Sequence, residues 1–268
     1  MLTKQSRLES VLNASTIGVT ISGISNFELN ELKINPLTNY PDLPTIRLGK
    51  QIERVFSFLI QNSSNYFILK ENCQIIDGKV TIGELDFIIK NNGTKEISHL
   101  EIVYKFYLYD PCQSSIELEK WIGPNRKDSF LEKLDKLKLK QFPLLYKPKT
   151  TEVLYDLDIN EMTQRLCFMS SLFVPFSMLN ESIPVVSNSA IVGYWLTLID
   201  FKALVKVMDQ YYLPKKQEWG IAPQSNSEWY SFSEVSVLIN ESLERQFSPL
   251  VWIKTSELTY EQCFIVWW

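Results

Sequence analysis

The sequence predicts an α/β protein with a mixed central sheet flanked by helices and a smaller C-terminal α+β unit. Two observations predict this fold. The 268 residues include 12 Tyr, 15 Phe and 7 Trp but only 9 Gly, and this composition favours β-rich packing over a helical bundle. In addition, an amphipathic pattern over 46–62 is followed by alternating apolar runs that are separated by short turns, which predicts a helix beside an antiparallel sheet.

The helix over 46–62 has the clearest periodicity. Leu48, Ile52, Val55 and Leu59 recur at helical spacing and form one apolar stripe. Glu53 falls at the edge of that stripe, whereas a solvated glutamate more often lies opposite it. Two interpretations stay open, a boundary glutamate and an acid held near a functional site.

Apolar runs next predict strands at 66–69, 72–76, 81–90 and 99–108. Asp77-Gly78 between two of these runs is a hairpin signal, and Asn91-Asn92-Gly93 marks a second turn. Connections this short make the strands antiparallel.

A helix is expected over 123–140, where Gly-Pro-Asn ends the preceding run. Pro143, Pro148 and the polar residues after them mark a boundary, so we expect an N-terminal lead-in and core over 1–148 and an α+β unit over 149–268. The remaining expected elements are a short helix and a strand at 18–21 before the core, and strands at 167–173, 192–196, 249–253 and 263–268 with helices at 201–210 and 233–246 after it.

Composition excludes several classes of protein. His99 is the only histidine, which argues against histidine-based zinc sites and Ser-His-Asp catalysis, and it is expected to be an ordinary strand residue. The four cysteines have no C-x-x-C spacing and are expected to be reduced thiols, although disulfides stay open on arithmetic alone. No apolar run approaches a membrane span or a signal peptide, so we expect a cytoplasmic protein without a membrane partner.

Acidic residues gather in the two strands at 81–90 and 99–108. Glu84 and Asp86 share one face of the first strand, and Glu101 and Lys105 share one face of the second, because side chains alternate along a strand. If the strands pair, carboxylates and a lysine converge. Carboxylates are hard ligands for Mg²⁺, a bound metal can acidify water, and a lysine can stabilise developing negative charge. Phosphodiester hydrolysis needs these groups.

Gly83-Glu84-Leu85-Asp86 and the following strand with Glu101 and Lys105 resemble the PD-(D/E)XK nuclease superfamily. Several further stretches resemble a bacterial family of unknown function that is assigned to that superfamily. These stretches are 48–53, 81–86, 101–108, 123–125 and 193–196. The resemblance implies a restriction-endonuclease-like core over about 46–142, with Asp86 and Glu101 binding Mg²⁺ or Mn²⁺, Glu84 able to substitute, Lys105 catalytic and Glu53 accessory.

One position departs from that pattern. The superfamily's acid lies two residues before the lysine, where this chain has Val103. Glu101 lies two residues earlier on the same face, roughly 6.6–6.8 Å along the strand. A bulge could return it to the site, Glu84 or Glu53 could replace it, or the site is inactive. An ion pair between Glu101 and Lys105 on an exposed face, and a capping role for Glu84, are the alternatives without catalysis.

The helix over 123–140 opens the only clear basic segment. Six lysines stand against two acids between Leu131 and Lys149. Arg126, Lys127 and Lys133 are the residues that we expect to contact a nucleic-acid backbone, because charge and free N–H groups at a helix start suit a phosphate. A solvated face and ordinary helix capping by Asp128 are the alternatives. Four tryptophans could stack bases or form core; they are Trp195, Trp219, Trp229 and Trp252.

These observations predict a divalent-metal-dependent phosphodiesterase that acts on nucleic acid. The alternative is an inactive protein of the same fold that serves as a binding or interaction module. Net charge is −4, so any surface that binds nucleic acid must be local. The sequence carries no signature of an oligomeric state.

Overall fold

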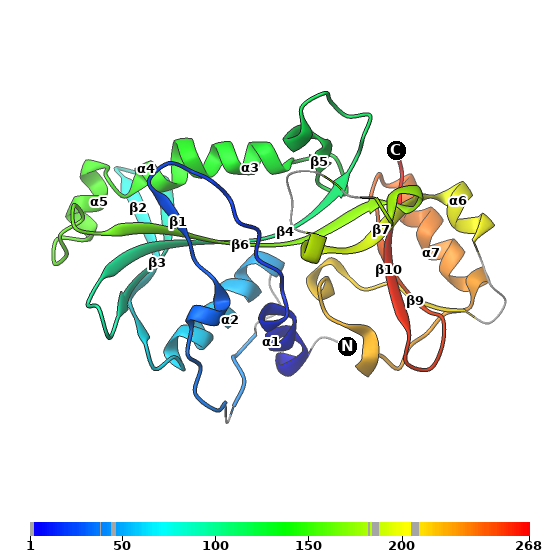
Figure 1. Ribbon diagram of the computed structural model, residues 1–268, viewed down its shortest axis with the longest axis horizontal. Helices are drawn as coiled ribbons and strands as arrows, with labels where there is room; N and C mark the ends of the chain where they lie inside the picture. The colour runs from blue at the N-terminus through cyan, green and yellow to red at the C-terminus, as the bar shows by residue number, and fades with distance from the viewer. Residues whose placement is uncertain (1–2, 38, 44–46, 182, 184–187, 205–208) are drawn as a thin grey trace. The chain divides into compact units, whose positions relative to one another are not determined.

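A computed structural model of the chain describes residues 3–37, 39–43, 47–181, 183, 188–204 and 209–268. It is an α/β protein in which a large mixed sheet is flanked by helices (Figure 1), and this confirms the predicted class. Contacts divide the chain into two compact units. Unit 1 comprises 1–15, 105–131 and 170–268, and unit 2 comprises 16–104 and 132–169. Separate domains over 1–148 and 149–268 stay a prediction.

Unit 2 begins its sheet with a helix and three strands. Helix α2 (Leu48–Gln61) packs on strand β2 (Tyr66–Asp77), which forms a hairpin with β3 (Val80–Asn91). Strand β3 pairs antiparallel with β4 (Ile97–Tyr109), which lies in unit 2 up to Tyr104. The helix and hairpins are confirmed over the described residues; Ile46 at the predicted helix start lies outside them. The two short strands predicted at 66–69 and 72–76 are the single strand β2.

The interruption that divided β2 in the sequence is local. The pairing of β2 with β3 shifts register between Ile68 and Lys70, and Asn72 adopts a left-handed φ of 50°. Both features disturb the apolar alternation without ending the ladder. A pattern of period two therefore fails here although the strand continues.

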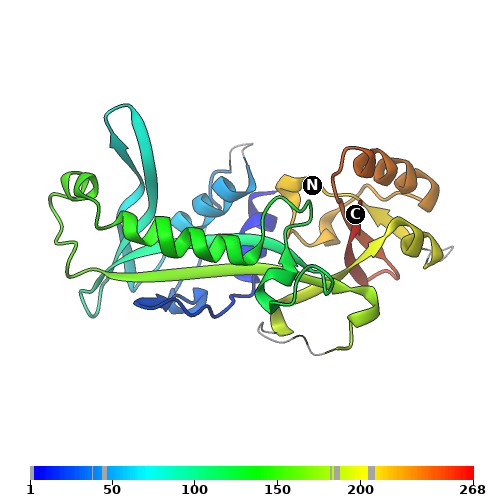
Figure 2. The same cartoon turned by 90° about the horizontal axis from the view of Figure 1, so that it is seen from above.

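The rest of unit 2 adds β6, which follows β4 in the strand order and belongs to this unit up to Met169, and the helices beside it. Strand β6 pairs in parallel with β1, and the helix that begins with α3 runs along β6 in both Figure 1 and Figure 2. The strand predicted at 18–21 is wrong, because residues 18–20 form no strand and Ile21 makes only an isolated bridge with Ile24. The remaining elements are β1 (Ile24–Asn26), η1 (Leu29–Glu31), α3 (Phe130–Lys136), a π-helix (Leu137–Gln141), α4 (Phe142–Leu144), α5 (Pro148–Val153) and β6 (Thr163–Pro175).

Packing between the helical segment and β3 depends on a glycine. Leu144, Leu145, Leu85 and Ile88 belong to one buried cluster. A Cβ at Gly83 would lie 2.4 Å from a methyl group of Leu144, which is far inside van der Waals contact. Glycine in the Gly-Glu-Leu-Asp stretch therefore lets the helical segment lie close to the strand that carries Asp86.

Unit 1 contains the other part of the same ten-stranded sheet and a buried cluster of its own. Strand β7 lies between β6 and β10 in parallel pairing, and β10 and β9 form an antiparallel hairpin with β8 at the edge. Its elements are α1 (Lys4–Leu12), η2 (Glu117–Lys120), β5 (Trp121–Ile122), η4 (Phe176–Met178), η5 (Asn188–Ala190), β7 (Ile191–Thr197), α6 (Leu198–Ala203), β8 (Gln210–Tyr212), η6 (Lys216–Glu218), η7 (Pro223–Ser225), α7 (Phe232–Glu244), β9 (Leu250–Lys254) and β10 (Tyr260–Val266).

Most of the predicted C-terminal elements are confirmed. The helix over 233–246 is α7, and all four strands appear. The helix predicted over 201–210 begins earlier, as α6; its residues 205–208 lie outside the described residues, and Gln210 starts β8. Trp219 and Trp252 are buried, which confirms the core interpretation for these two tryptophans.

Candidate functional site

Asp86 and Glu101 meet where the β3–β4 ladder ends. The last regular pair is Phe87 with Leu100, and Asp86 and Glu101 occupy the next position on each strand. Beyond it, side chains replace main-chain partners. The Ile102 N–H donates to Oδ2 of Asp86 at 3.0 Å, and the Asp86 nitrogen lies 3.5 Å from Oε1 of Glu101. Glu101 therefore reaches Asp86 although Val103 occupies the position expected to be acidic.

The Glu101 carboxylate is fully buried and both of its oxygens accept hydrogen bonds. Nε2 of His99 lies 2.9 Å from Oε1, and Nε2 of Gln141 lies 2.5 Å from Oε2. Buried carboxylates need such partners because transfer out of water is costly. Glu101 is thus held in one orientation by two neighbouring side chains.

His99 is fully buried and its contacts assign its tautomer. The Gln164 amide nitrogen donates to the Phe142 carbonyl at 2.8 Å, which fixes the amide orientation, and it lies 3.1 Å from Nδ1 of His99. Nδ1 is therefore an acceptor, so Nε2 carries the proton and donates to Glu101. His99 is a polar residue of strand β4, as expected, and in addition it joins β6 to the Glu101 carboxylate.

Gln141 owes its place to the π-helix that ends at this residue. Such helical irregularities often occur at functional sites because they redirect side chains. Lys133 donates to the Gln141 amide oxygen at 2.8 Å, so the Gln141 NH₂ group points to Glu101. A continuous chain of hydrogen bonds thus runs from Lys133 through Gln141, Glu101 and His99 to Gln164.

The pKa of Asp86 is raised well above its usual value. Burial of the carboxyl group is the largest cause, and the negative charge of Glu101 is the next. The Ile102 N–H and the charge of Lys133 act in the opposite direction without cancelling these effects. A proton or a cation at this place would relieve the repulsion between the two carboxyl groups.

Glu53 and Glu84 form a second acidic pair beside this site. Lys50 of α2 donates to Glu53 at 2.5 Å and to Glu84 at 2.7 Å. Burial raises the pKa of Glu53, Lys50 lowers it, and the charges of Glu84 and Glu101 raise it further. Glu53 therefore belongs to the electrostatic surroundings of Glu101, and Glu84 is held by Lys50 instead of capping the hairpin turn.

Lys105 belongs to unit 1, whereas the carboxyl groups above belong to unit 2. Its ammonium group makes an ion pair with Asp128 at 2.5 Å. Both partners are partly exposed, and such pairs contribute about 0–1 kcal/mol to stability. Lys105 therefore pairs with Asp128. The ion pair between Glu101 and Lys105, which was the alternative without catalysis, does not form.

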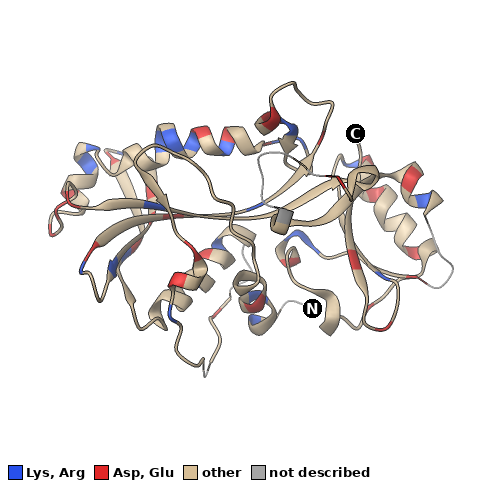
Figure 3. Ribbon diagram, viewed as in Figure 1, with Lys and Arg blue, Asp and Glu red and all other residues tan. Residues whose placement is uncertain are grey.

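Arg126 and Lys127 lie in a loop and not at a helix start, because α3 begins at Phe130. Gly123 donates to the Asp128 carbonyl, and Arg126 adopts a left-handed φ of 54°. The Arg126 guanidinium donates to Asp110 at 2.6 Å and lies 4.2 Å from the ring centre of Trp268. Lys127 is exposed. Figure 3 shows the lysines that follow as blue bands along the helix.

We tested the donor set against the metal that the resemblance implies. Within the described ranges, no group of three or more His, Cys, Asp or Glu side chains could hold a metal ion. Magnesium needs only one or two protein carboxylates and keeps several waters. Among these residues Oδ2 alone of Asp86 has a hydrogen bond, which leaves Oδ1 for a ligand. Both carboxylates are ligands of the kind that Mg²⁺ takes, but only Asp86 offers an oxygen without a hydrogen bond, since both oxygens of Glu101 already accept one.

Two other observations concern the thiols and membrane-spanning helices. All four cysteines are free thiols, as expected. No helix in the described part of the chain has the length and apolar character needed to cross a membrane.

The sequence did not assign a role in this site to Lys50, His99, Gln141 or Gln164. Only His99, a single histidine two residues before Glu101, gave any signal.

The fold and this site define an α/β protein in which a buried Glu101 and a half-buried Asp86 lie opposite each other on adjacent strands. A family model described as a domain of unknown function, DUF1853, matches residues 5–266, so the chain belongs to that family. Neither the characterised proteins nor the solved structures give a match. None of these comparisons links the chain to the PD-(D/E)XK superfamily, and that resemblance stays a prediction.

Proposed function

We propose that this protein is a divalent-metal-dependent phosphodiesterase that acts on nucleic acid, with its site at Asp86 and Glu101. One observation carries the proposal. Asp86 and Glu101 lie opposite each other where the ladder ends, each carboxylate accepts from the main chain of the facing strand, and burial and the charge of Glu101 raise the pKa of Asp86. Strong shifts of this kind are concentrated at functional sites.

The residues have distinct roles in this proposal. Asp86 and Glu101 would hold Mg²⁺ or Mn²⁺, and a bound metal would acidify water and neutralise phosphoryl charge. His99 and Gln141 orient Glu101 through its two oxygens. Lys133 is the lysine whose charge acts on Asp86 within unit 2, and we assign to it the positive charge beside the reacting phosphate. Glu53 adds negative charge near Glu101.

Cleavage assays test the proposal directly. Single- and double-stranded DNA and RNA are incubated with Mg²⁺ or Mn²⁺ and either the wild type, Asp86→Asn or Glu101→Gln. We expect each substitution to reduce cleavage by about 100-fold or more, beyond the 10–100-fold typical of residues that only orient a metal ligand. Asp135→Asn is the matched control, because Asp135 is an exposed acid on α3. Cleavage that survives Asp86→Asn contradicts the site.

A second candidate is an inactive protein that binds a partner. The observation that favours it is that Glu101 is fully buried with both oxygens already hydrogen-bonded, as a structural carboxylate would be. Thermal unfolding with and without Mg²⁺ separates the two candidates. Binding to the native state raises the melting temperature, so a Mg²⁺-dependent rise that Asp86→Asn abolishes supports the enzyme, and an unchanged melting temperature favours the binding protein.

A further inference from the structure

Unit 1 contains an open groove of about 890 Å³ that lies outside the acidic pair described above. Its walls come from the residues after β6, from β7 and from the β9–β10 hairpin. This volume is in the range of small-molecule sites. Because the groove lies wholly within unit 1, it is independent of the proposed phosphodiesterase site.

Exposed apolar side chains form part of the groove. Phe176, Leu179 and Val192 line it, and their exposed fractions are 39%, 40% and 37%. The Phe176 ring meets the ring of Tyr194 edge to face, with centres 5.0 Å apart. Apolar residues gathered in a concave surface mark a binding site more often than scattered ones do.

The charged residues of the groove are all acidic. Glu181 and Glu261 line it, and no lysine or arginine does among the residues that the structure describes. An adjoining cavity of about 160 Å³ shares the Phe176, Tyr194 and Glu261 walls and adds Asp209. Across the described ranges none of these three carboxylates has an ion pair with a lysine or arginine. A wall of one sign attracts ligands of the opposite sign.

Tyr194 reports this negative potential. Its hydroxyl group donates to Oε2 of Glu261 at 2.8 Å. Burial raises the pKa of Tyr194, and Cys263, Glu261 and Asp209 raise it further. The same surroundings raise the pKa of Tyr211 to about 12, through burial first and Asp209 next. Glu261 and Asp209 thus both act on Tyr194, which lines both cavities.

Trp252 adds a second, independent feature of the groove. It lines the wall, only 9% of its surface is exposed, and its indole Nε1 has no hydrogen-bond partner among the described residues. An ammonium group cannot satisfy this donor, because it has no acceptor atom, so the ring face of Trp252 is the part that a cation contacts. Tryptophan also offers the aromatic face that attracts cations most strongly.

We propose that this groove binds a linear aliphatic polyamine. One ammonium group lies between Glu261 and Asp209, beside the ring of Tyr194, and a second lies at Glu181. The methylene chain between them covers Leu179 and Val192. A diamine matches two acidic positions joined by an apolar wall, and it places its cations beside carboxylates and aromatic rings of the described lining.

Titration calorimetry with spermidine and with putrescine tests this assignment on the full chain. We expect the wild type to bind, and Glu261→Gln to weaken binding by about tenfold or more, the loss of one charge-assisted contact. The amide oxygen that this substitution introduces can still accept from Tyr194, so the fold is retained. Asp209→Asn should also weaken binding. Raised salt should weaken wild-type binding.

The matched control is Glu244→Gln, which removes the same charge from an exposed position on α7. Binding that falls equally in this control reports attraction to the acidic protein as a whole and overturns the proposal. So does the absence of spermidine binding, or affinity that Glu261→Gln leaves unchanged. A lysine-rich peptide that binds where spermidine does not would assign the groove to a protein partner instead.

Discussion

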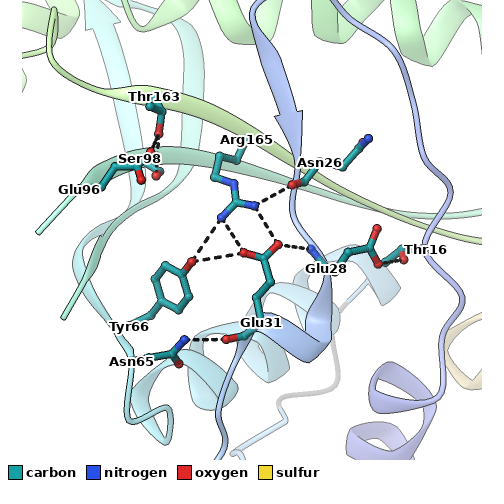
Figure 4. A network of polar contacts seen from close by, with 10 residues as sticks. All are labelled: Thr16, Asn26, Glu28, Glu31, Asn65, Tyr66, Glu96, Ser98, Thr163 and Arg165. Carbon is teal, nitrogen blue, oxygen red and sulfur yellow. Dashed lines mark hydrogen bonds and ion pairs between the residues drawn. The ribbon is translucent and has the colours of Figure 1, made fainter. Parts of the chain in front are cut away.

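Two polar clusters in unit 2 hold strands together with opposite electrostatic arrangements. In the first, Arg165 of β6 donates to both oxygens of Glu31, at 2.9 and 2.8 Å, and to the Asn26 carbonyl and the Tyr66 hydroxyl (Figure 4). In the second, Asp86 and Glu101 lie opposite each other, and their carboxyl groups accept hydrogen bonds from the Ile102 N–H, His99 and Gln141, which are neutral donors. One cluster pairs an acid with a base, and the other pairs an acid with an acid.

The pKa directions follow from this difference. Burial alone would raise the pKa of Glu31, but the hydrogen bonds and charge of Arg165 outweigh burial and lower it. Burial and the charge of Glu101 act together on Asp86 and raise its pKa. A paired acid contributes to stability as it stands, whereas a repelled acid gains stability only from a proton or a cation. The comparison therefore marks the first cluster as structural and the second as the functional candidate.

The largest expected effect is at His99. His99→Leu removes the donor at 2.9 Å from Oε1 of Glu101, which keeps only the 3.5 Å contact with the Asp86 nitrogen. It also removes the acceptor of one Gln164 N–H, while Gln164 still donates to the Phe142 carbonyl, so two buried polar groups each lose a hydrogen bond. We expect the free energy of unfolding to fall by about 3 kcal/mol, the sum expected for two such groups. Urea denaturation at neutral pH measures the change.

His99→Gln is the matched variant, because its amide can donate to Glu101 while it remains buried. We expect it to recover part of the loss. If His99→Leu is as stable as the wild type, the chain from Gln164 to Glu101 does not fix the carboxylate, and the second cluster loses its scaffold in the comparison.

Part of this arrangement could be predicted from residue patterns. Alternation placed Asp86 and Glu101 on facing strands, and the hairpin signals set their antiparallel order. The partners of Glu101 could not be predicted, because Gln164 lies 65 residues from His99 and Gln141 depends on a π-helix. Local propensity does not encode contacts of this kind. The loop in which Asp128 pairs with Lys105 could not be predicted either, because its Gly-Pro-Asn stretch also suits a helix start.

Arg165→Met is expected to have the next largest effect. It removes the partner of a partly buried carboxylate and the cation 4.7 Å from the Phe27 ring centre. We expect a loss of about 1–2 kcal/mol at pH 7, a low value for a buried pair because Glu31 is partly exposed. Arg245→Met is the control, since Arg245 is exposed and its ion pair with Glu241 is long.

The pH dependence identifies the source of that loss. Because the folded-state pKa of Glu31 is lowered, its contribution is present above the unfolded value of about 4.3 and is lost as pH falls through the folded pKa. The stability difference between the wild type and Arg165→Met should therefore shrink in acid. A difference that is constant from neutral pH into acid would mean that packing, and not the ion pair, accounts for it.

Asp86→Asn has the smallest expected effect and the opposite sign. The folded-state pKa of Asp86 is raised, so its contribution to stability is present below the unfolded value of about 3.9 and is lost as pH rises through the folded pKa. The asparagine oxygen can still accept from Ile102, and its amide can donate to Glu101. We expect the variant to be more stable than the wild type at pH 7 by on the order of 1 kcal/mol, and the gain to vanish in acid. Asp135→Asn should show neither change. A variant that is less stable than the wild type at pH 7 would show that Asp86 is held by attraction, and the two clusters would then be electrostatically alike.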